Sequence, residues 1–127
     1  MKHLPSSDIQ KLHLQLIQMR TRLLDEIQAA EAEIKTAHEA QEGEGRMGSD
    51  ASELIRFEEV RRSEIEIDER QLRAVQEAEL RMSEGQYGIC TDCGAEIARE
   101  RLLAMPTAVR CMLCENKQTA FEIRDHS

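Results

Sequence analysis

Residues 85–114 read GQYGICTDCGAEIARERLLAMPTAVRCMLC, and this stretch is the most informative part of the sequence. It contains two C-x-x-C pairs, Cys90 with Cys93 and Cys111 with Cys114, and 17 residues separate the pairs. This spacing is typical of a tetrahedral zinc site in which each pair lies on a tight turn. Because four thiolates fill the metal shell and leave no position for water or substrate, we expect one structural Zn²⁺ per chain.

Two disulfides or an iron–sulfur cluster are the alternative uses of these cysteines. The first 20 residues lack a positively charged start followed by an apolar core, so no signal peptide is expected. We therefore expect a cytoplasmic protein, and in a reducing compartment the spacing favours zinc.

The composition explains why a metal is needed. The chain has 127 residues, of which 33% are charged, with one tyrosine, two phenylalanines and no tryptophan. This composition does not suit a large globular core and favours long helices that bury a narrow apolar stripe beside a small, metal-stabilised subdomain. No apolar run approaches the roughly 20 residues of a membrane span, so no membrane partner is expected.

The charge is acidic and unevenly placed. The net charge is −8, and residues 1–89 carry 12 Lys/Arg against 19 Asp/Glu. Duplex binders neutralise phosphates with a basic patch, so the sequence predicts no direct DNA binding. An enzyme is not expected either, because the sequence offers no nucleophile beside a base and no phosphate-binding loop.

A long helix is predicted from about residue 8 to about residue 41. Ser6, Ser7 and Asp8 are candidate N-caps. Apolar residues then recur every three or four positions, which indicates one buried face. They are Ile9, Leu12, Leu16, Met19, Leu23, Ile27, Ala30, Ile34 and Ala37.

A turn is expected next, because glycines at 43, 45 and 48 would weaken a helix. Ser49 or Asp50 can cap a second helix that runs to about Glu84, where Gly85 ends it. Its apolar residues are sparser, and Arg61, Asp68 and Glu79 interrupt the heptad. The apolar residues are Leu54, Phe57, Val60, Ile65, Ile67, Leu72, Val75 and Met82.

These elements predict a mainly α fold, with a long antiparallel helical hairpin, a small four-cysteine zinc-finger subdomain and a short C-terminal helix over about 115–124. Phe121 and Ile123 are expected to pack against the finger or the hairpin base. We divide the chain into residues 1–84, with the hairpin tip near 42–52, and residues 85–127. A lone hairpin of this length buries little area, so a partner outside the chain is expected. The alternative to a monomer is a homodimer that pairs two hairpins into a four-helix bundle.

Three motifs together carry a family resemblance. They are the G-x-C-x-x-C-G core from Gly88 to Gly94, the R-L-x-A-x-P-T-A bridge over 101–108, and the second C-x-x-C pair. With the long hairpin before them, they resemble the DksA/TraR family over almost the whole chain.

This resemblance implies a bacterial transcription regulator of the stringent response. Members of the family bind RNA polymerase directly and insert the hairpin into its secondary channel without binding DNA. They change the lifetime of promoter complexes, often together with ppGpp. The resemblance thus implies bacterial RNA polymerase as the partner of this chain, with ppGpp at the shared interface.

The hairpin tip departs from the family pattern. Its best-known members carry Asp-x-x-Asp-x-Ala there, and alignment from Cys90 places Met47, Asp50 and Ser52 at those positions. Asp50 alone matches, although Glu44 can supply a second carboxylate if the turn shifts register. Such a carboxylate could act on a divalent ion in the channel, whereas the plain alternative is a helix cap. The divergent tip leaves open a paralogue that competes for the channel in response to redox state or zinc.

The arginines and histidines are expected to have ordinary roles. Arg61, Arg62, Arg70 and Arg73 are predicted to form a solvated face with acidic partners, although they could also face polymerase or a phosphate. Arg99, Arg101 and Arg110 are predicted to offset the charge of the four thiolates. None of His3, His13, His38 and His126 is expected to bind the metal.

Overall fold

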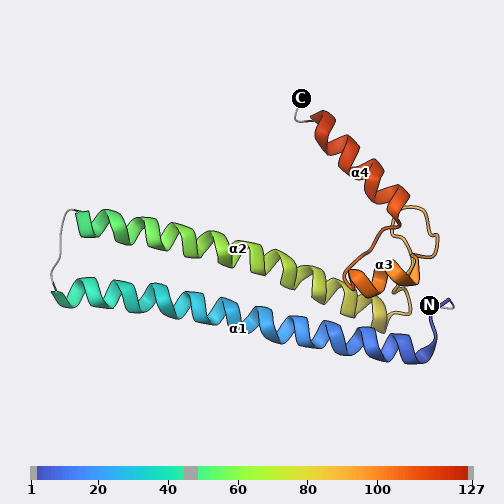
Figure 1. Ribbon diagram of the computed structural model, residues 1–127, viewed down its shortest axis with the longest axis horizontal. Coiled ribbons are helices and arrows are strands. Elements are labelled where there is room, and N and C mark those ends of the chain that lie inside the picture. The colour runs from blue at the N-terminus through green and yellow to red at the C-terminus, as the bar shows by residue number, and fades with distance from the viewer. Residues whose placement is uncertain (1–2, 45–48, 126–127) are drawn as a thin grey trace. The chain divides into compact units, whose positions relative to one another are not determined.

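The computed structural model describes residues 3–44 and 49–125 and is entirely helical in its named elements (Figure 1). α1 spans Ser6–Glu44, α2 spans Ser49–Ser83, α3 spans Arg99–Ala104 and α4 spans Met112–Asp125. The predicted mainly helical class, hairpin and C-terminal helix are confirmed. The predicted turn falls largely on residues 45–48, which lie outside the described residues.

The apolar face of α1 is as predicted. All nine of its expected residues are buried or half-buried, and Leu12, Leu16 and Leu23 have no exposed surface. Neighbouring leucines that are off this pattern, Leu14 and Leu24, are about half exposed, at 55% and 44%. The three-and-four spacing therefore identifies the side of α1 that packs.

In α2 the heptad continues through the polar residues that were predicted to interrupt it. Arg61, Asp68 and Glu79 are half-buried and occur in register with Ile65 and Val75. By contrast Val60 and Ile67, which were counted among the apolar residues of this helix, are exposed at 55% and 46%. The residues on the inner face at three-and-four spacing are Leu54, Glu58, Arg61, Ile65, Asp68, Leu72, Val75, Glu79 and Met82.

The chain forms two compact units. The first contains Met1–Gln18 with Ala74–Ser127, and the second contains Met19–Arg73. Within the second unit, α1 and α2 run antiparallel, because Glu33 pairs with Arg61 while His38, further along α1, pairs with the earlier residue Glu58. The division of the chain into residues 1–84 and 85–127 stays a prediction.

The core of the first unit lies around the finger. Tyr87, Ile97 and Leu102 are fully buried there, as are Leu12 of α1 and Val75 of α2. Leu102 belongs to α3, a single short helix that the sequence analysis did not predict. Its end is fixed by a hydrogen bond from the Met105 N–H to the Arg101 carbonyl, 2.8 Å long.

None of the helices that the structure describes is long and apolar enough to cross a membrane.

Candidate metal centre

The four cysteines converge on one point. Their sulfur atoms all lie within 4.8 Å of one another, and Cys93 Sγ is 3.8 Å from Cys111 Sγ. Zn–S bonds of about 2.3 Å in a tetrahedron require sulfur–sulfur edges of about 3.8 Å. The donor set and its spacing therefore fit one structural Zn²⁺, as predicted.

The first knuckle, residues 90–93, is closed by backbone hydrogen bonds. The Gly94 N–H donates to the Cys90 carbonyl at 3.0 Å, and the Cys90 N–H donates to the Ala95 carbonyl at 2.8 Å. Gly94 has φ +76°, a left-handed conformation that a side chain would strain. Ile89 and Glu96 form an isolated antiparallel bridge across the turn. The glycine thus lets the chain reverse directly after two ligands.

The second knuckle, residues 111–114, continues into a helix. α4 begins at Met112, three residues before the predicted start, so Cys114 lies in its first turn. The Glu115 N–H donates to the Cys111 carbonyl at 2.9 Å and starts the helical hydrogen bonding. A helix N-terminus favours negative charge, so this geometry suits a thiolate ligand.

The thiols cannot all ionise without a cation. Burial raises the pKa of Cys90, but backbone N–H groups of Cys111, Cys93 and Asp92 outweigh burial and lower it to about 6. Hydrogen bonding with Cys111 and Cys90, together with burial, raises the pKa of Cys114 to about 12. One sulfur therefore holds negative charge while a neighbour keeps its proton, and a divalent cation is the group that would allow all four to ionise.

Two of the three arginines predicted to offset thiolate charge lie at the knuckles. Arg110 Nε donates to Asp92 Oδ2 at 3.0 Å, and Arg101 Nε donates to the carbonyl of Arg110 at 3.0 Å. The prediction for Arg99 is wrong, because its guanidinium pairs with Asp8 at 2.5 and 3.1 Å. Asp8 is thus an ion-pair partner of α3.

The end of α2 leads directly into the first knuckle. The Gln86 N–H donates to the Arg81 carbonyl and the Gly85 N–H to the Met82 carbonyl, which is a Schellman motif. Gly85 has φ +74°, as that motif requires. The Arg81 side chain also donates to the carbonyls of Gln86 and Ile89, at 3.0 and 2.6 Å. The finger therefore follows the end of α2 through a hydrogen-bonded turn.

The N-terminal segment also contacts the finger. Leu4 is buried, and His3 Nε2 donates to the Ile97 carbonyl at 2.8 Å. His3 Nδ1 lies 3.0 Å from Glu96 Oε2. A Cβ added at Gly88 would approach both His3 and Leu4 to 3.2 Å, so this glycine allows the close packing. Sequence reasoning missed these contacts, because residues more than 80 positions apart form them.

A comparison with protein-family models matches residues 85–120 to the prokaryotic dksA/traR C4-type zinc finger. Residues 85–120 therefore form a zinc finger of the dksA/traR type. A search of curated proteins finds no match. Among solved structures, transcription factor DksA2 from Pseudomonas aeruginosa is similar, with a TM-score of 0.80 and 22% identity over 92% of this chain and 87% of that one. The dksA/traR-type finger is therefore part of a DksA2-like fold.

The predicted tip residues are not part of the finger, and the structure describes the side chain of only one of them. Ser52 is exposed on α2. The side chains of Glu44, Met47 and Asp50 are not among those described, and neither are those of Phe121 and Ile123. Their roles stay predictions.

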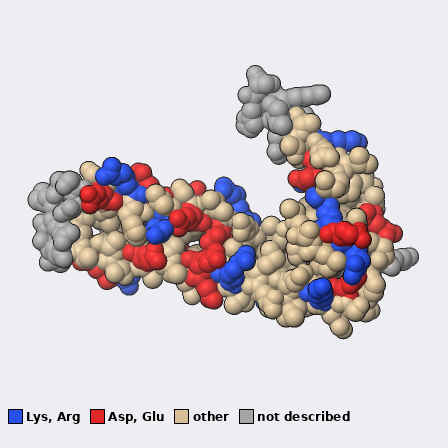
Figure 2. Space-filling view, in the orientation of Figure 1, with Lys and Arg blue, Asp and Glu red and all other residues tan. Residues whose placement is uncertain are grey.

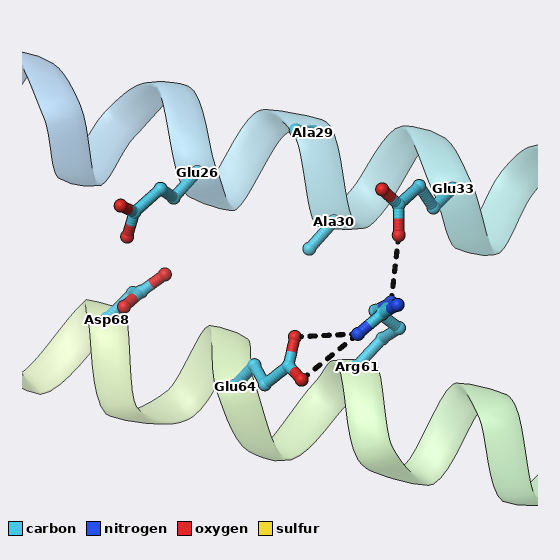
Figure 3. A pocket seen from close by; sticks show the side chains of 7 residues that line it. All are labelled: Glu26, Ala29, Ala30, Glu33, Arg61, Glu64 and Asp68. Atoms are coloured by element: carbon cyan, nitrogen blue, oxygen red, sulfur yellow. Dashed lines mark hydrogen bonds and ion pairs between the residues drawn. The ribbon is translucent and has the colours of Figure 1, made fainter.

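An open hollow of about 420 Å³ lies between α1 and α2 in the second unit (Figure 3). It forms where α1 presents the small residues Ala29 and Ala30 to the polar positions of α2. Arg61 crosses it, with Nε 2.8 Å from Glu33 Oε2 and Nη1 3.0 Å from Glu64, and lies 5.1 Å from the Phe57 ring centre. Arg62 is exposed and pairs with Glu58 at i,i+4, as predicted, whereas Arg61 is half-buried on the inner face of α2 and is not part of a solvated face.

Proposed function

We propose that this chain is a bacterial transcription regulator that binds RNA polymerase directly. The hairpin enters the secondary channel of the enzyme, and the protein changes the lifetime of promoter complexes without binding DNA. ppGpp is the candidate co-effector at the shared interface. In this proposal the zinc is structural, the chain performs no catalysis itself, and it acts as a monomer in the cytoplasm.

One observation carries the proposal. A dksA/traR-type finger lies at the base of a hairpin, in a fold that matches a transcription factor along nearly its whole length. The metal centre supports a structural role for the zinc, because four sulfurs fill a tetrahedral site and leave no position for a substrate.

The surface charge supports a protein partner over DNA. Acidic and basic side chains are interspersed along the hairpin on the described part of the face in Figure 2. Residues 1–89 have seven more acidic than basic residues. The described part of this face shows no continuous basic stripe of the kind on which duplex binding depends.

The working end of the proposed regulator is the tip, with Asp50 as the main candidate and Glu44, Met47 and Ser52 beside it. A carboxylate near the catalytic metal of polymerase would interact strongly, because a narrow protein channel screens charge poorly. A variant of Asp50 should therefore still bind polymerase but lose the effect on promoter complexes, because the hairpin provides the contact area and Asp50 provides the carboxylate.

Binding is tested by mixing the zinc-loaded chain with core RNA polymerase and measuring the complex by size-exclusion chromatography. A 1:1 complex is expected, and another factor that occupies the secondary channel should displace the chain. No complex at micromolar concentrations would refute the proposal. A shift of duplex DNA by the chain alone at low salt would refute the claim that DNA is not bound.

Regulation is tested by transcription in vitro from a ribosomal RNA promoter, with and without ppGpp. Asp50→Asn should keep polymerase binding and lose most of the effect on transcript yield. Asp25→Asn is the matched control, because it removes the same charge from an exposed position of α1. Equal loss in both variants would show that general charge, and not the tip carboxylate, carries the effect.

A second candidate function follows from the divergent tip and the exposed thiol of Cys93. The chain could occupy the channel as a competitor whose binding depends on zinc or on thiol oxidation. Peroxide treatment should then release zinc and change the amount of polymerase complex. Unchanged zinc content and unchanged binding after peroxide would remove this candidate.

A further inference from the structure

One ion-pair cluster connects the two halves of the metal centre. Arg110 lies directly before the second knuckle. Its Nε donates to Asp92 Oδ2 of the first knuckle at 3.0 Å, and its Nη1 is 3.6 Å from Glu115 Oε2, directly after the second knuckle. A single guanidinium therefore bridges the first knuckle and the start of α4.

This bridge lies beside a sulfur contact between the two knuckles. The sulfur atoms of Cys93 and Cys111 are 3.8 Å apart. The residues directly before these two cysteines, Asp92 and Arg110, form the ion pair. The ion pair and the sulfur pair therefore connect the same two segments.

The backbone at Arg110 is held independently of its side chain. Arg101 Nε donates to the Arg110 carbonyl at 3.0 Å. One residue earlier, the Val109 carbonyl accepts the Thr91 N–H at 2.8 Å, which joins the chain to the first knuckle. The backbone at Arg110 is thus placed by α3 and by the first knuckle together.

The net charge of the ion-pair cluster shows whether Arg110 can offset the charge of the thiolates. Four thiolates on a divalent cation carry a net charge of −2. Arg110 is matched to two carboxylates, so the trio of Arg110, Asp92 and Glu115 has a net charge of −1. The trio therefore supplies no excess positive charge to offset the thiolates.

We propose that Arg110 is a positioning residue of the metal centre, which keeps the two knuckles converged and thereby slows the release of zinc. Outer-shell partners of metal sites typically change metal affinity by about 10–100-fold. Arg110 acts one residue away from the ligands, so the low end of that range applies. This inference concerns retention of the metal and does not depend on binding to polymerase.

The experiment measures zinc release from the full-length, zinc-loaded chain into an excess of a chromogenic chelator. Arg110→Gln should release zinc about tenfold faster than the native chain. Arg110→Lys, which keeps the charge but loses the planar two-nitrogen geometry, should be intermediate. Asp92→Asn should release zinc faster by a factor similar to that of Arg110→Gln, and the double variant should be no faster than either, because all remove the same bridge.

The control is Lys117→Gln, which removes one positive charge from an exposed position one turn beyond the second knuckle. It should release zinc within about twofold of the native rate, since Lys117 is not part of the bridge. The visible spectrum of the cobalt-substituted Arg110→Gln chain should keep its four-sulfur tetrahedral bands, because the ligands are intact. Native release rates in Arg110→Gln, additive effects in the double variant, or equal acceleration by Lys117→Gln would overturn the proposal.

Discussion

Asp8 in the first turn of α1 and Arg99 at the start of α3 form a two-nitrogen ion pair across 91 residues of sequence. Asp8 is 8% exposed, so the pair is partly shielded from solvent. This contact joins the start of the hairpin to the finger within one compact unit.

Asp8→Asn should lower the urea midpoint of the chain at pH 7. Hydrogen bonding from Arg99 lowers the pKa of Asp8 below its ordinary value of 3.8. A carboxylate with a lowered folded-state pKa stabilises the fold above the unfolded-state pKa, and this contribution is lost as the pH falls through the folded-state value. The difference between the native chain and Asp8→Asn should therefore be present at pH 7 and shrink below about pH 4.

Far-UV circular dichroism during urea titration measures this difference. Glu84→Gln is the control, because it removes one carboxylate from an exposed position of the same unit. A midpoint difference of equal size at pH 7 and pH 3 would contradict the assigned role of the ion pair.

Removal of zinc should loosen α4 before the rest of the chain. Of the α4 residues whose side chains the structure describes, 112–120, only Cys114 is buried, and it is a metal ligand. A helix of this length is marginal in water without packing, so it depends on that ligand. Hydrogen exchange with and without a chelator should show faster exchange in α4 and the knuckles, and unchanged exchange in residues 19–42 and 51–73.

Zinc binding should release protons and weaken as the pH falls. The ligands bind as thiolates, and the metal-free Cys114 is protonated at pH 7 because its pKa is raised to about 12. The thiol of Cys90, with its pKa lowered to about 6, is mainly ionised at pH 7 and protonated below that value. Calorimetry in buffers of different ionisation enthalpy should show release of at least one proton at pH 7, and affinity should fall steeply below about pH 6. Affinity that does not change between pH 7.5 and pH 5.5 would contradict thiolate ligation.

The adjacent leucines Leu23 and Leu24 should differ sharply in their contribution to stability. Leu23 is fully buried, so Leu23→Ala should lower the free energy of unfolding by about 2–5 kcal/mol. Leu24 is 44% exposed, and Leu24→Ala should cost about 1 kcal/mol or less. Denaturant unfolding at two protein concentrations measures both variants. A large, concentration-dependent effect of Leu24→Ala would instead favour the homodimer.

Features fixed by local sequence were predictable. The nine inward residues of α1 follow from helical periodicity, and the four metal ligands follow from the spacing of two short pairs. The end of α2 just before Gly85 follows from glycine chemistry.

Features fixed by distant residues were not predictable. α3 is too short for a periodic signal and is held by the burial of Leu102. The partner of Arg99 could not be inferred, because Asp8 also suits a helix cap. The polar residues in the inner face of α2 appeared to break the heptad, whereas Arg61 is accommodated there by Glu33 across the hairpin.

The chain carries one tyrosine and no tryptophan, and that tyrosine, Tyr87, is buried in the first unit with its hydroxyl donating to the Pro106 carbonyl at 2.8 Å. Tyrosine emission therefore reports on the surroundings of the finger, while residues 19–73 contain no tyrosine or tryptophan. An unmodified sample contains its own optical probe, and a titration followed by tyrosine fluorescence will describe one unit of this molecule and not the other.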